Sequence, residues 1–283
     1  MKDRDAVATQ RLSLHGTSEE AVRALEGRFA DLEILEVGRH GNKLRPGHLR
    51  GNRFTVRLCD LGDDDAARVA ATLAELAKTG FPNAFGPQRF GRDGDNAERA
   101  LAFVRDETPP PRDPRLRRLL FSALQARWFN RVLEARVREG TFATPLLGDL
   151  LQKHPSGALF SCEDVETDRA RAAAFEVSPT GPMFGAKMAR PGLEILAREL
   201  AALAEDRVTE ADLERHRALG EGTRRTLRVP MDDFGTDHVA GGLVVRMTLP
   251  RGAYATTALG LAVDLVQPRA GAGATGQGSA EPP

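Results

Sequence analysis

Residues 39–58 read RHGNKLRPGHLRGNRFTVRL, and this stretch combines two patterns that decide the local fold. Its first part, within residues 38–51, is rich in glycine and poor in helix-forming residues, which indicates a long irregular loop. From Phe54 onward, apolar side chains alternate with polar or charged ones, and the series Phe54, Val56, Leu58 is typical of a strand with one buried face. The sequence therefore predicts a loop that leads into a half-buried strand.

Positive charge is concentrated in the same stretch. Between Val37 and Cys59 the chain has no acidic residue but six lysines and arginines, namely Arg39, Lys43, Arg45, Arg50, Arg53 and Arg57. A second basic run extends from Arg112 to Arg118. The chain as a whole is neutral, with 40 Lys+Arg and 40 Asp+Glu, which argues against a protein that coats nucleic acid through its net charge. Locally dense positive charge still favours a nucleic-acid partner, because each neutralised phosphate releases counterions; the alternative is an ordinary solvated surface.

Outward from this stretch, helices and strands are both expected. Alternating apolar residues and β-branched runs predict strands at residues 6–14, 32–37, 54–58, 226–229 and 242–249. Helical periodicity and end signals, including a capping box at Thr17 and Glu20, predict helices at residues 17–29, 63–80, 116–138, 193–203 and 210–219. Residues 148–184 mix short strands and turns, and residues 268–283 have the composition of a disordered tail. Strands at both ends and a largely helical middle predict an α+β fold with an insertion.

The sequence contains no convincing motif for binding a cofactor or a metal. A GxGxxG pattern at Gly271, Gly273 and Gly276 lies between prolines, without the strand and helix that a dinucleotide site needs. The six histidines have no metal-ligand spacing, so we expect neither a cofactor nor a metal. No apolar run is long enough for a transmembrane helix. Cys59 and Cys162 are expected to be reduced, buried, small apolar residues of a cytoplasmic protein.

Four segments, taken together, resemble the motifs of one known family. They read KDRDAVATQ at residues 2–10, RHGNKLRPGHLRGNRF at 39–54, FPNAFGPQRFG at 81–91 and LPRGAYATT at 249–257. They occur in the family's order, and a weaker match, GPMFG at residues 181–185, lies between the last two. The chain is thereby identified as a member of the TruD family of tRNA pseudouridine synthases, with a resemblance that covers roughly residues 2–259.

The resemblance implies an α+β pseudouridine synthase fold with a mixed or antiparallel sheet and an inserted, largely helical domain. The implied division is a catalytic domain at 1–78 and 226–267, an inserted domain at 79–225 and a tail at 268–283. The implied reaction is the isomerisation of uridine 13 in the D arm of tRNA to pseudouridine. That reaction requires no cofactor, the partner is tRNA, and we expect a monomer in the cytoplasm.

The site residues follow from the same resemblance. Asp3 takes the place of the catalytic carboxylate, which acts as a nucleophile at C1′ of the ribose or as a base at C2′. Lys2, beside it, is expected to help keep Asp3 ionised and to contact the substrate. Asn52 is expected to bind the uracil edge or hold the aspartate loop, and Phe54 to form a stacking wall or simply to pack in the core. Tyr254 stands where the family commonly has a phenylalanine that stacks on the target base.

Phosphate contacts are expected from four side chains of the basic loop, namely Arg39, Lys43, Arg45 and Arg50. The segment at residues 83–91 is interpreted as a structural hinge into the insertion, because its glycines and Pro82 suit a connection rather than catalysis.

The sequence departs from the family pattern in two places. The family has a β-rich segment before the first motif, and an Arg-Glu pair where this chain has Gly260 and Leu261. We therefore expect the 283-residue chain to be inactive or barely active. The alternatives to an enzyme are a non-catalytic RNA-binding remnant and an inactive fragment.

Overall fold

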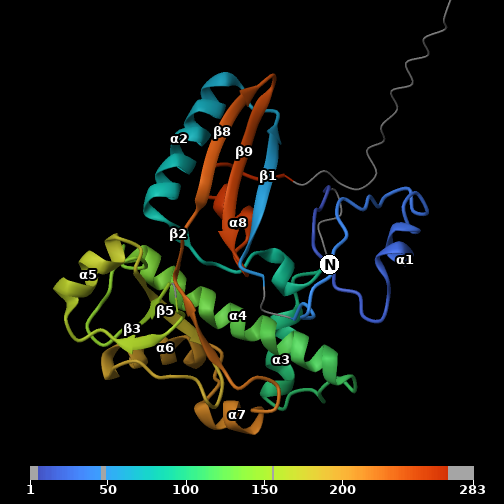
Figure 1. Cartoon of the computed structure of the whole chain (residues 1–283). Helices are drawn as coiled ribbons and strands as arrows, with labels where there is room; N and C mark the ends of the chain where they lie inside the picture. Colours follow the sequence, from blue (N-terminus) through green and yellow to red (C-terminus); the bar gives the residue numbers. More distant parts are fainter. Residues whose placement is uncertain (1–5, 46–48, 155, 267–283) are drawn as a thin grey trace, which may run out of the picture. The chain divides into compact units, whose positions relative to one another are not determined.

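The computed structural model of the chain describes residues 6–45, 49–154 and 156–266. Its internal contacts divide the chain into two units, residues 1–50 and residues 51–283. Figure 1 shows the elements of each unit. The predicted tail at 268–283 lies outside the described residues.

The first unit has little regular structure. It contains one short helix, α1 (Glu19–Arg23), whose N-cap is Ser18, with a side-chain oxygen that accepts a hydrogen bond from the backbone N–H of Ala21. The predicted strands at 6–14 and 32–37 are wrong, since these residues form no regular secondary structure. The predicted helix at 17–29 is much shorter than expected. The physical reason is a lack of packing: no described side chain within residues 6–45 is buried, and helices and strands of this length need burial to be stable.

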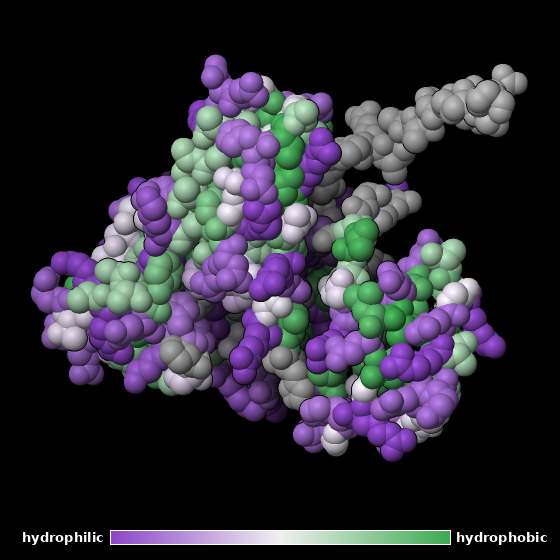
Figure 2. Space-filling view, turned by 45° about the horizontal axis from the view of Figure 1, so that its top comes forward, coloured by the Kyte–Doolittle hydropathy of each residue, from purple (hydrophilic) through white to green (hydrophobic). Residues whose placement is uncertain are grey.

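Large apolar side chains of this unit are consequently exposed. Val7, Leu12, Leu14, Phe29, Leu32 and Leu35 all face solvent. Figure 2 shows apolar residues among the hydrophilic ones on the surface of the protein.

A three-stranded antiparallel sheet forms one part of the second unit. Its strand order is β1 (Gly51–Cys59), β9 (Gly242–Pro250), β8 (Asp232–Val239), and α2 (Asp63–Thr79) packs beside it (Figure 1). The predicted strands at 54–58 and 242–249 and the helix at 63–80 are confirmed. β8 was not predicted, because none of its side chains is buried and they do not alternate as those of a half-buried strand would.

The core of this part lies on one face of the sheet. Leu58 of β1 is paired with Leu243 of β9, and both are buried against the apolar side chains Val69 and Leu73 of α2. The short helix α8 (Ala255–Leu259) contributes Leu259 to the same cluster. Burying these branched side chains removes apolar area from water and so fixes the register of β1 against β9.

Two short strands mark where the chain leaves this part and returns to it. β2 (Phe81–Pro82) pairs with β7 (Arg228–Val229), so residues far apart in sequence lie side by side. The side-chain amide of Asn83 donates to the backbone oxygen of Thr226 at 2.8 Å and adds to this connection. The division into catalytic and inserted domains at 79 and 225 remains a prediction.

Between these strands the chain forms further helices, four of which contribute to a core around Trp128, and a four-stranded sheet. The helices are α3 (Asn96–Val104), α4 (Pro114–Arg138), α5 (Val165–Ala173), α6 (Leu193–Ala204) and α7 (Glu210–Arg215), with a 3-10 turn η1 (Pro87–Phe90) before them. The sheet has the order β4 (Leu159–Ser161), β3 (Leu150–Lys153), β5 (Val177–Met183), β6 (Thr223–Thr226). The predicted helices at 116–138, 193–203 and 210–219 are confirmed with shifted ends, and α3 and α5 were not predicted.

α4 begins two residues earlier than expected because Asp113 caps it and Pro114 occupies its first turn. The Asp113 carboxylate accepts from the backbone N–H of Arg115 at 2.8 Å, and proline in the first turn loses no helical hydrogen bond.

The two cysteines differ from the prediction in one respect. Both are free thiols; Cys162 is buried as expected, whereas Cys59 is exposed. Cys59 follows Leu58 on β1, and the alternation of a strand places it on the opposite, solvent-facing side. Burial raises the pKa of the Cys162 thiol to about 12, so this residue is an unreactive core side chain.

The described part of the chain contains neither a membrane-spanning helix nor a cluster of metal-binding side chains. Among its helices, none combines the length and hydropathy needed to span a bilayer. Within residues 6–45, 49–154 and 156–266, no group of three or more His, Cys, Asp or Glu side chains is arranged to hold a metal ion.

Candidate active site

Asn52 and Phe54 lie at the beginning of β1, on the face that carries the core. Asn52 is opposite Leu249 of β9, and Phe54 is opposite Met247. Phe54 is half-buried and packs against the core cluster of this sheet, so core packing is one of its roles. The side-chain amide of Asn52 is also half-buried but forms no hydrogen bond with a described residue, which leaves its donors and acceptor available to a ligand.

Tyr254 reaches the same end of the sheet from β9. Because Gly51 pairs with Pro250, the start of β1 lies beside the end of β9, and a turn then leads to Tyr254 at the N-cap of α8. Gly252 in this turn has φ of 81°, a conformation that favours glycine. The Tyr254 side chain is half-buried, so one part of its ring is available for stacking.

The Tyr254 ring packs against Phe85, which precedes η1. Their ring centroids are 6.2 Å apart, with the ring planes inclined by 64°. α4 fixes Phe85 through Asn130, whose side-chain oxygen accepts from the Phe85 N–H at 2.9 Å and whose amide donates to the Phe85 carbonyl at 3.0 Å. An aromatic residue held by both of its backbone polar groups makes a rigid support for Tyr254.

Arg225 of β6 completes this cluster. Its guanidinium carbon lies 4.0 Å from the centroid of the Phe85 ring, and its Nη2 donates to the Gly252 carbonyl at 2.9 Å. Burial lowers the pKa of the Arg225 guanidinium to about 10, so the group stays protonated at neutral pH. The cluster therefore contains a permanent positive charge beside the aromatic pair.

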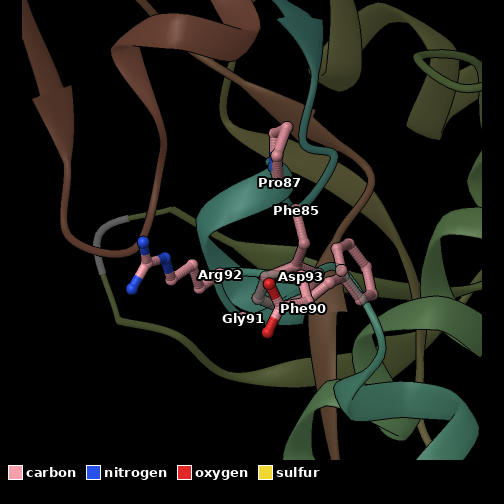
Figure 3. Close-up of a pocket in the computed structure, with 7 residues that line it drawn as sticks. Phe85, Pro87, Phe90, Gly91, Arg92 and Asp93 are labelled. Atoms are coloured by element: carbon pink, nitrogen blue, oxygen red, sulfur yellow. The ribbon is translucent and has the colours of Figure 1, made fainter. Parts of the chain in front are cut away.

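A shallow hollow of about 530 Å³ is formed by Phe85 and the η1 segment that follows it. It is lined by Phe85, Pro87, Phe90, Gly91, Arg92, Asp93 and Gly94. Figure 3 shows the two phenylalanine side chains close together, while Arg92 extends away from them. Phe85 contributes both to this open hollow and to the contact with Tyr254.

The structure brings together three of the four motif segments. Asn52 and Phe54, Phe85, and Tyr254 all belong to the second unit and lie around the end of the β1–β9 pair. Asp3 and Lys2 fall outside the described residues. The basic residues Arg39, Lys43, Arg45 and Arg50 belong to the first unit, where their side chains are exposed, and of these Arg39, Lys43 and Arg50 form no ion pair with a described residue.

The sequence interpretation did not single out Phe85, Asn130 or Arg225. Phe85 belongs to the segment FPNAFGPQRFG, so the motif itself was the signal, but its glycines favoured a hinge instead. No local sequence pattern identifies Asn130 or Arg225 as site residues, because the residues that they contact are distant in sequence.

Comparison with solved structures supports the fold. The chain is similar to the crystal structure of the putative tRNA pseudouridine synthase D (TruD) from Methanosarcina mazei, with a TM-score of 0.64, over 86% of this chain and 75% of that chain. The two sequences are 19% identical, so this similarity concerns the fold.

Sequence comparison identifies the family. A family model described as "tRNA pseudouridine synthase D (TruD)" matches residues 1–108 and 110–260. The tRNA pseudouridine synthase D of Anaeromyxobacter sp. (strain Fw109-5) is 43% identical over 264 residues, which are 92% of this chain and 74% of that protein. The protein of the same name from Thermus thermophilus is 36% identical over 259 residues, 92% of this chain and 70% of that protein.

These similarities define the class of protein as a pseudouridine synthase, an isomerase. Within that class the chain belongs to the TruD family, as the sequence resemblance predicts.

Proposed function

We propose that this chain isomerises uridine 13 in the D arm of tRNA to pseudouridine at a low rate, with Asp3 as the catalytic carboxylate. The observation that carries the proposal is the meeting of three motif segments at one end of the β1–β9 pair, in a chain that matches the family model over nearly its whole length. The fourth motif segment, at residues 2–10, contains Asp3.

The proposed reaction needs only rearrangement of bonds within one nucleotide. The bond between N1 of uracil and C1′ of ribose breaks, the uracil turns, and a bond forms between C5 and C1′. C5 loses one proton and N1 gains one, so that the product is an isomer and no electron donor is consumed. Asp3 acts either by attacking C1′ or by removing a proton from C2′.

The other residues of the site are suited to holding the uracil. We propose that Tyr254 stacks on the base once it has left the helical stack, with Phe54 as a wall of the pocket and Asn52 as a hydrogen-bond partner of the uracil edge. The half-buried Tyr254 ring and the unsatisfied amide of Asn52 support these roles. Lys2, adjacent to Asp3, is proposed to keep the carboxylate ionised and to contact the substrate.

The function is tested by incubating the protein with an unmodified tRNA transcript under single-turnover conditions, with protein in excess. Pseudouridine is located by carbodiimide labelling followed by primer extension. We expect a stop at position 13 that is absent from a transcript with cytidine at that position. Modification at another uridine would contradict the target, and tRNA binding without any pseudouridine would indicate an RNA-binding protein that is not an enzyme.

We further propose that Arg39, Lys43, Arg45 and Arg50 contact RNA phosphates, because no acidic residue occurs in their stretch. Changing both Arg45 and Arg50 to Glu should weaken tRNA binding and reduce the slope of log affinity against log salt by about one for each lost contact. The measurement is filter binding at several salt concentrations. Arg68→Glu with Lys78→Glu, on the exposed face of α2, is the control, and these changes should leave the slope nearly as it is. An unchanged slope in the Arg45, Arg50 variant would mean that the loop is only a solvated surface.

A further inference from the structure

Arg225 connects two motif segments that are far apart in sequence. Besides the Gly252 carbonyl, its guanidinium binds Asn83: Nε and Nη2 each lie 3.3 Å from the Asn83 backbone oxygen, and Nη2 also donates to the side-chain oxygen. One side chain of β6 thus holds the start of the segment at 83–91 and the turn that leads to Tyr254.

The same guanidinium also supports the aromatic pair. It stacks at 4.0 Å on Phe85, whose ring meets Tyr254, and lies 5.5 Å from the ring of Phe129. A planar group with five N–H donors can stack on a ring and bind carbonyl oxygens in its own plane, whereas a lysine ammonium is a point charge and cannot do both. The contact therefore depends on arginine itself and not only on its charge.

Arg228, three residues further along the chain, also stacks on an aromatic ring and donates to backbone carbonyls, but in a different part of the structure. Its guanidinium carbon lies 3.5 Å from the ring centroid of Phe175, and it donates to the carbonyls of Thr79 at 2.6 Å and Ala172 at 2.8 Å. Burial lowers its pKa to about 10, as it does for Arg225. None of these contacts involves the turn before Tyr254. Of these two arginines, Arg225 binds that turn and Arg228 does not.

From this difference we infer that Arg225 is a positioning residue for Tyr254: it fixes the Gly252 turn and, through Phe85, the orientation of the tyrosine ring. The catalytic consequence of this inference rests on the proposed function, because it assumes that Tyr254 stacks on the target base. The structural consequence, an ordered Tyr254 ring, does not depend on the proposed function.

The experiment compares Arg225→Lys with Arg228→Lys in the full chain. Tyr254 is the only tyrosine of the sequence, so incorporation of 3-fluorotyrosine gives one ¹⁹F NMR signal that reports on its environment. We expect Arg225→Lys to shift or broaden this signal and Arg228→Lys to leave it unchanged, although both variants lose some thermal stability. In single-turnover assays Arg225→Lys should be slower by about tenfold or more, since a displacement of 1 Å can cost about a hundredfold, while tRNA affinity stays within about threefold.

An unchanged ¹⁹F signal in Arg225→Lys, or equal rate losses in both variants, would overturn the inference. If Arg225→Lys does not fold, Arg225→Gln is compared with Arg228→Gln instead, with the same expected difference in the ¹⁹F signal. If the unaltered protein makes no pseudouridine, the proposed function has failed, and the ¹⁹F signal by itself decides whether Arg225 positions Tyr254.

Discussion

Substitution of Asp3 by Asn is expected to reduce the rate of pseudouridine formation below about one-thousandth of that of the unaltered protein. The reason is chemical: the amide can neither attack C1′ nor accept the proton, and removal of a group that takes part directly in bond making or proton transfer costs factors of this order. Affinity for tRNA should remain within a few-fold, because phosphate contacts supply most of the binding free energy.

The measurement is single-turnover kinetics together with filter binding of the same variant. Asp5→Asn is the matched control, because Asp5 is an acidic residue of the same segment two positions away, and it should retain activity within a few-fold. Asp3→Ala is included since it cannot regain a carboxylate by deamidation. Wild-type turnover in both Asp3 variants would disprove the proposed role of this residue.

The largest effect on stability is expected for Asp149→Ala. Asp149 is fully buried and accepts hydrogen bonds from Nη1 and Nη2 of Arg136 at 2.9 and 3.0 Å and from the N–H of Leu146 at 2.8 Å. This pair connects the end of α4 to the start of β3. Its removal leaves the Arg136 guanidinium buried without a counter-charge, which typically lowers the free energy of unfolding by about 3–5 kcal/mol.

Urea denaturation followed by circular dichroism measures this change. The control is Glu139→Gln, which breaks the exposed pair between Arg198 and Glu139, also joined at 2.9 Å. The side chains of that pair are 46% and 49% exposed, so the expected loss is at most about 1 kcal/mol. Similar losses in the two variants would show that burial does not determine the strength of the Arg136–Asp149 pair.

Elements with strong periodicity could be predicted from the sequence. The alternation in β1, the apolar run of β9 and the amphipathic pattern of α2 are consequences of burial on one face, and each was located within a few residues. β8 could not be found in this way, because an edge strand without buried side chains has no such pattern. Its strand conformation comes from hydrogen bonds to β9.

In the N-terminal residues the sequence pattern predicted strands that the structure does not contain. Residues 6–14 and 32–37 have the composition of strands but form none, because a strand is stable only when its backbone groups pair with a neighbour. Local preference alone did not decide their conformation.

The sequence by itself determined the family and the motif residues of the candidate site, because the order and spacing of motifs are properties of the sequence. Only the tertiary structure joined Phe85 and Arg225 to Tyr254. Arg225 and Asn83 are 142 residues apart in sequence, and no local pattern encodes such a pair. Their contact follows from the pairing of β2 with β7 and the packing of α4 against β5, which bring distant segments together through backbone hydrogen bonds and apolar burial.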